Sequence, residues 1–93
     1  MAINFLNNPK VGDNVKIEVG DSSDLQIYHD TTDSYITNTT GDLTISNTGA
    51  NSDDLILKSA DDFLLYVQGT ELAIQAVGNS GVILRHNNVV KFE

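Results

Sequence analysis

The chain has 93 residues, a formal net charge of −8 and no cysteine. A single chain of this size forms one domain at most and buries only about 60–65% of the surface that it exposes when unfolded. The basic residues number only five and are scattered, which argues against nucleic acid and anionic membranes as partners, because both favour clustered Lys and Arg. The absence of cysteine excludes disulfides and thiolate metal sites.

The beginning of the chain predicts neither export nor membrane insertion. Residues 1–8 lack the basic region and the apolar run of a signal peptide, and no later segment reaches membrane-spanning length. We therefore expect synthesis in the cytoplasm.

Residues 1–14 are predicted to form an N-terminal arm, because Pro9 and its Asn and Gly neighbours favour turns. Residues 15–93 alternate short apolar stretches with polar turns, and we expect them to form a single β-repeat region. No stretch has a helical period long enough to predict a helix. The first strands are expected at Val15–Val19, Leu25–His29, Tyr35–Thr37 and Leu43–Ser46.

A five-residue cassette recurs along this region: a small residue, an acid, Leu, any residue, then Ile. It is complete at Ser23–Ile27 and Gly41–Ile45. Degenerate copies, with apolar residues at the third and fifth positions, stand at Asp53–Leu57, Asp61–Leu65, Thr70–Ile74 and Ser80–Leu84. The acid suits a turn, where it can accept backbone N–H groups, and the two apolar residues point to one face of a strand.

Those third and fifth positions are the predicted core. Its members are Leu25, Ile27, Leu43, Ile45, Leu55, Leu57, Phe63, Leu65, Leu72, Ile74, Val82 and Leu84. Strands that each supply about two inward side chains, with only 6% aromatic residues, favour a β-helix over a sandwich. Because such a core is thin for one chain, the preferred architecture is an all-β trimeric β-helix or β-prism, with a single-chain β-solenoid and a sandwich as alternatives.

Three stretches together resemble the repeats of tail-fibre proteins from marine bacteriophages, particularly cyanophages. They are Gly20–Asp30 with Ser34–Ile36, Thr40–Ile45 and Gly81–Glu93. The resemblance spans about residues 13–93. Two positions depart from it: Thr31 stands where the family often has Gly, and Ile83 where it often has an acid.

The resemblance implies a homotrimeric, rigid shaft in the virion, made in the host cytoplasm, which links other tail proteins to a host-binding tip. Contact with a host surface glycan would then be made by regions outside this chain. A monomeric β-solenoid that binds calcium or carbohydrate is the alternative from a different functional class.

No catalytic, cofactor or metal site is expected, and the chain is predicted not to be an enzyme. His29 and His86 are far apart in the sequence and form no His-x-His pair, so we interpret them as strand-edge residues. The acids at Asp53–Asp54 and Asp61–Asp62 could supply oxygen ligands to calcium, but they lack the tandem glycine-rich nonapeptides of calcium-binding solenoids and are interpreted as turn formers.

Overall fold

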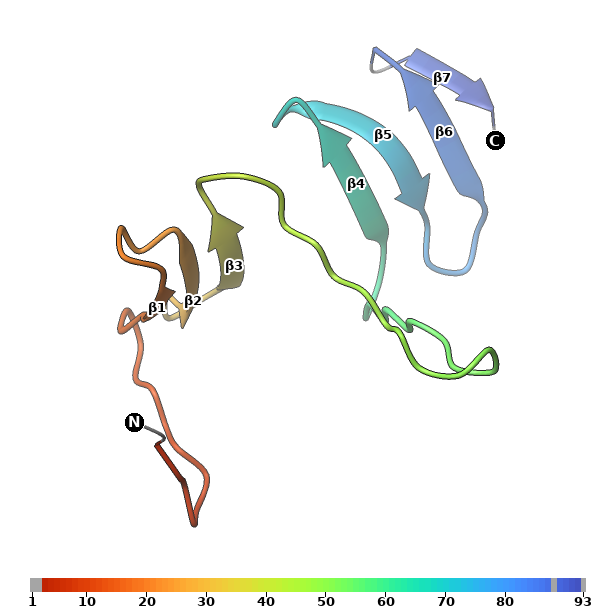
Figure 1. The fold of residues 1–93 in the computed structure, drawn as a ribbon. Coiled ribbons are helices and arrows are strands. Elements are labelled where there is room, and N and C mark those ends of the chain that lie inside the picture. Colours follow the sequence, from red (N-terminus) through yellow and green to blue (C-terminus); the bar gives the residue numbers. More distant parts are fainter. Residues whose placement is uncertain (1–2, 88, 93) are drawn as a thin grey trace. The chain divides into compact units, whose positions relative to one another are not determined.

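The computed structural model describes residues 3–87 and 89–92, and the side chain of residue 92 is outside the description. The chain divides into two units, Met1–Ser46 and Asn47–Glu93, each with one antiparallel sheet (Figure 1). In the described residues there is no helix, so the all-β prediction is confirmed.

The sheet of the first unit is a meander of three strands in the order β1-β2-β3: Ile17–Val19, Leu25–His29 and Ser34–Asn38. Cross-strand pairs join Ile17 to Ile27 and Ile27 to Ile36, so the isoleucines form one row across the sheet. The predicted strand at Leu25–His29 has the observed bounds, and those at Val15–Val19 and Tyr35–Thr37 are found within two residues of their predicted ends.

The sheet of the second unit is a meander in the order β4-β5-β6-β7 (Figure 1). Its strands are Phe63–Val67, Glu71–Ala76, Val82–His86 and Val89–Phe92. The register shifts between Leu65 and Tyr66 and again between Leu84 and Arg85, because the pairing skips Ala73 of β5 and Lys91 of β7.

An aspartate turn connects β2 to β3. The Asp30 carboxylate accepts hydrogen bonds from the backbone N–H of Thr32 at 3.0 Å and of Asp33 at 2.8 Å, and the Asp30 N–H donates to the Asp33 carbonyl at 3.0 Å. Thr31 has a φ of +82°, a backbone conformation that glycine adopts without strain. The turn therefore needs the conformation that a glycine would supply, although the residue is β-branched.

Of the cassette acids that accept hydrogen bonds, Asp53 binds a nearby backbone N–H as predicted, whereas Asp24 and Asp62 accept from residues 16 positions away. The Asp24 carboxylate accepts from the Thr40 hydroxyl at 3.0 Å, and its carbonyl accepts from the Thr39 N–H at 2.9 Å, which ties the end of β3 to the start of β2. Asp62 accepts from the Gly78 N–H at 3.0 Å, and Asp53 from the Ala50 N–H at 2.7 Å.

Two predicted apolar strands do not form in the single chain. Residues 43–46 and 55–58 have no helix, strand or turn assignment, and within the described part of the chain no hydrogen bond reaches their backbone. The strand prediction for Leu43–Ser46 and the equivalent role of Leu55–Leu57 are therefore wrong for one chain. The pattern is present, but the chain supplies no neighbouring strand.

No helix in residues 3–87 and 89–92 is long and apolar enough to cross a membrane.

Candidate functional site

One face of the first sheet is apolar and uncovered in the single chain. Side chains at alternate positions of a strand point to the same face, so the row Ile17–Ile27–Ile36 has the pair Val19–Leu25 beside it. The three isoleucines are 47%, 40% and 59% exposed, respectively, although they stand in paired strands. The sheet forms an apolar face without burying it.

The second sheet repeats this arrangement. Its cross-strand pairs form two rows on one face, Phe63–Ala76–Val82 and Leu65–Ile74–Leu84. Phe63, Leu65, Val82 and Leu84 are each 38–52% exposed. Opposite this face, Ile83 pairs with Gln75 and is half-buried.

Eleven of the twelve predicted core residues are on these faces or in the unpaired segments. Leu72 pairs with Tyr66 beyond the register shift, and the single chain buries none of the twelve. No hydrophobic residue in the described part of the chain is buried, and neither is any polar one. The eight members in strands belong to β2, β4, β5 and β6, whereas Leu43, Ile45, Leu55 and Leu57 are 49–64% exposed in the segments without a strand partner. In a single chain, therefore, the residues predicted to form the core remain at least partly exposed to solvent.

The solvent-accessible area of the chain shows how much surface is left unburied. The chain exposes 8271 Å². A compact domain of 10.1 kDa would expose roughly 5300 Å², and even two separate compact bodies of half that mass would expose roughly 6400 Å². The excess of roughly 1900–3000 Å² is larger than the ~800 Å² that each partner contributes to a standard protein interface. The molecule has enough uncovered surface for an obligate assembly.

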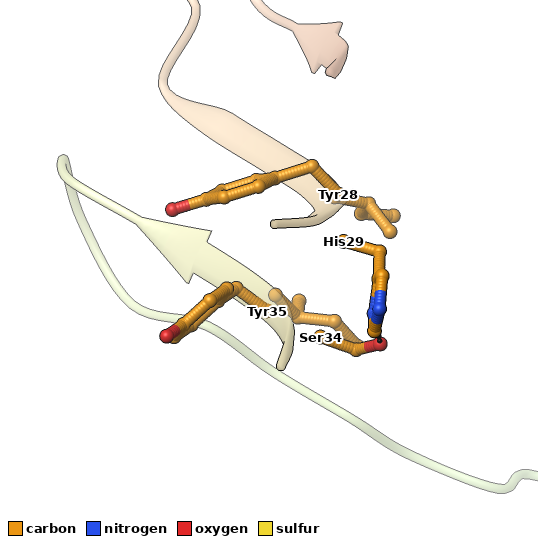
Figure 2. A pocket seen from close by; sticks show the side chains of 6 residues that line it. Tyr28, His29, Ser34 and Tyr35 are labelled. Carbon is orange, nitrogen blue, oxygen red and sulfur yellow. Dashed lines mark hydrogen bonds between the residues drawn. The ribbon is translucent and has the colours of Figure 1, made fainter. Parts of the chain in front are cut away.

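The other face of the first sheet carries an aromatic cluster. The rings of Tyr28 and Tyr35, a cross-strand pair, are stacked with their centroids 5.1 Å apart and an interplanar angle of 27° (Figure 2). The ammonium group of Lys16 lies 4.7 Å from the centre of the Tyr28 ring, in cation–π range. Tyr28 is half-buried as a result, while Tyr35 on the edge strand β3 remains 38% exposed.

A shallow hollow of about 570 Å³ is lined by Ile27, Tyr28, His29, Ser34, Tyr35 and Ile36. Figure 2 shows the two tyrosines projecting to one side of the hairpin and the His29–Ser34 pair to the other. Because these groups diverge, the hollow has no convergent set of polar side chains of the kind that binds small ligands.

Each histidine is the last residue of a strand. His29 ends β2, and its Nδ1 is 2.8 Å from the Ser34 hydroxyl, while His86 ends β6 and is exposed. Each belongs to a different unit. Among the described residues, no group of three or more His, Asp or Glu side chains is placed to hold a metal ion.

Among the described titratable groups, the pKa values that are clearly shifted belong to the aspartate turn and to Tyr35 beside it. Hydrogen bonds from the backbone of Asp33 and Thr32 hold the pKa of Asp30 below its ordinary value. The negative charge of Asp30, assisted by partial desolvation and by Asp33, raises the pKa of Tyr35. The hydrogen bonds that lower the pKa of Asp30 stabilise a turn at the surface.

Comparison of the chain with models of known protein families, with curated proteins and with solved structures finds no match.

Proposed function

We propose that this chain is a structural segment of a bacteriophage tail fibre. Three copies would assemble into a rigid β-rich shaft that joins other tail proteins of the virion to a host-binding tip. The proposal combines the resemblance of residues 13–93 to phage fibre repeats with the one observation that carries it: the chain exposes roughly 1900–3000 Å² more surface than a compact protein of its mass.

The distribution of apolar surface supports association. Each sheet has one face of Ile, Leu, Val and Phe, and contiguous apolar patches of this kind on a soluble protein usually mark interaction sites. Hydrophobic stabilisation of about 25 cal/mol per Å² makes covering these faces the largest favourable term available to the chain.

The distribution of charge supports the same arrangement. Seven of the cassette and turn acids stand between strands: Asp24, Asp30, Asp33, Asp42, Asp53, Asp54 and Asp62. A net charge of −8 opposes association of identical chains, but carboxylates at the corners of an assembly stay hydrated and keep it soluble. A shaft with a thin apolar interior and acidic corners allows the chains to associate through their apolar faces while the negative charges stay apart in water. The number three comes from the resemblance.

Sedimentation equilibrium of the purified chain tests the proposal. The expected result is a single species with three times the chain mass of 10.1 kDa, stable on dilution through the micromolar range. A species of 10.1 kDa that persists at high micromolar concentration would overturn assembly altogether. A dimer would overturn the three-fold shaft and leave the surface-area argument standing.

Two further measurements test the biological role. Melting should be unchanged by a chelator, because a calcium-binding solenoid would lose stability when its metal is removed. Antibodies against the chain should label the tail fibres of virions that contain it. Virions whose fibres remain unlabelled would exclude the shaft role.

A further inference from the structure

Two extended segments of the chain have apolar side chains and an unpaired backbone. Leu43 and Ile45 are 49% and 63% exposed, and Leu55, Ile56 and Leu57 are 56–67% exposed. Within the described part of the chain, the backbone N–H and C=O groups of residues 43–46 and 55–58 have no hydrogen-bond partner. Such a row of free donors and acceptors is a template for pairing with another strand.

The loop between these segments is ordered by its own hydrogen bonds. The Asn47 side-chain amide donates to the Asp54 carbonyl at 2.9 Å, and the Asp53 N–H donates to the Ala50 carbonyl at 3.0 Å. The Asp53 carboxylate in turn accepts the Ala50 N–H. The hydrogen bonds of the loop join residues 47–54 to one another and, within the described part of the chain, reach neither extended segment.

We propose that residues 43–46 and 55–58 are strands of an inter-chain sheet, in which their backbone pairs with further copies of this same chain. The inference rests on the proposed assembly and states which part of the chain makes it. In contrast, the hairpins of β1–β3 and β4–β7 already have their ladders within one chain.

Surface area and charge indicate that the strands pairing with these two segments belong to other copies of the same chain. The unburied excess of roughly 1900–3000 Å² per chain is in the range of obligate self-association. Within residues 43–46 and 55–58 the only charged side chain is Lys58, although the chain carries 13 acids. Copies of a chain with net charge −8 can therefore pair along these segments without placing one carboxylate against another.

Amide hydrogen exchange, measured residue by residue at several chain concentrations, tests this pairing. At concentrations where sedimentation shows the assembly, amides of residues 43–46 and 55–58 should be protected at least ten-fold relative to the dissociated chain. The amides of β2 and β3 are the internal control, because their partners are in the same chain and their protection should change less on dilution.

The outcomes separate the inference from the proposed function. If the chain assembles while these amides exchange freely, the inter-chain strands are wrong and the shaft proposal survives. If the amides are protected in a monomer, pairing is within one chain and the inference is overturned. If the pure chain neither assembles nor protects them, both fail, which is also the result expected if the occupant were a different protein.

A matched pair of proline variants adds a test by mutation. Thr44→Pro removes an amide that has no partner in the single chain, so it should weaken assembly at least ten-fold without disturbing the hairpins. Asn51→Pro is the control, because residue 51 comes directly after Ala50 in a turn closed by the Asp53 N–H, a position that proline favours. Equal effects of the two variants would overturn the inference.

Discussion

The two complete copies of the cassette have different fates. Ser23–Ile27 leads into β2, which pairs with β1 on one side and β3 on the other. Gly41–Ile45 has the same pattern of small residue, acid, Leu and Ile, but its apolar residues belong to no strand. The same five positions therefore encode an extended segment in both places and a sheet in only one.

The connection after each copy explains the difference. After β2 the Asp30 carboxylate binds the N–H groups of Thr32 and Asp33, and this tight turn brings the next strand alongside. After Ile45 the chain enters the loop of residues 47–54, closed by Asn47 and Asp54, and the stretch beyond it forms no ladder. The cassette specifies which face is apolar, and the connecting turn decides where the partner strand comes from.

The substitution expected to have the largest effect on the second cassette copy is Ile45→Asp. If the second copy finds its partners in other chains, the substitution places several carboxylates in a shared apolar interior, at a cost of roughly 3 kcal/mol or more per chain. We expect sedimentation equilibrium to show monomers. Thr44→Asn is the control, because residue 44 points to the opposite face of an extended segment and the substitution adds no charge to the paired strand. A soluble trimer of Ile45→Asp would mean that the inward face has been assigned incorrectly.

The two copies also show which structural features a local sequence pattern can predict. The alternation of apolar residues predicts β2 with its observed bounds and places Leu25, Ile27 and His29 on one face, in agreement with the register. It also predicts that an acid of a cassette accepts a nearby backbone N–H at a turn, as Asp53 does. These features depend on neighbours within a few residues, so a local pattern determines them.

A local sequence pattern does not predict features that depend on residues far away in the chain. The stack of Lys16, Tyr28 and Tyr35 requires the cross-strand register, which is set by the turns and not by any of the three residues alone. The register shift opposite Leu65 and Tyr66, where the pairing skips Ala73 of β5, leaves no mark in the apolar run Leu72–Ala73–Ile74. The missing partner of residues 43–46 is likewise invisible, because an apolar strand has the same sequence pattern whether its neighbour belongs to the same chain or to another.

Thr31→Gly should stabilise the turn after β2, which lets the first cassette copy pair with a strand of the same chain. A non-glycine residue in the left-handed region costs about 1–2 kcal/mol, and the greater freedom of glycine in the unfolded chain returns about 0.5–1 kcal/mol of that. At a φ of +82° for Thr31, we therefore expect a net stabilisation of about 0.5–1 kcal/mol. Urea unfolding at one fixed chain concentration measures it, because dissociation would otherwise change the apparent stability.

The neighbouring threonine is the control for that variant. Thr32 is not among the residues with positive φ, and its N–H still reaches Asp30 after substitution, so Thr32→Gly should destabilise by about 0.5–1 kcal/mol. Equal effects of the two glycines would show that backbone strain at Thr31 does not limit the hairpin.

The smallest expected effect is the pH dependence of the same turn. Because hydrogen bonds from Asp33 and Thr32 lower the pKa of Asp30 in the folded state, its contribution to stability is present above the ordinary pKa of 3.8 and is lost as the pH falls through the lowered value. Asp30→Asn keeps an oxygen acceptor without the charge. The stability difference between wild type and this variant should be constant near neutral pH and should shrink below pH 3.8.

Tyr35 reports independently on the same charge, since Asp30 is the largest cause that raises the pKa of its hydroxyl. Asp30→Asn should therefore lower the Tyr35 pKa toward its ordinary value of 10.0, as measured by NMR of the ring carbons. Asp33→Asn is the matched control and should lower it less, because Asp33 is a smaller contributor. If Asp33→Asn had the larger effect, the turn that pairs the first cassette copy would be organised around Asp33, and the contrast with Gly41–Ile45 would have to be traced to that residue.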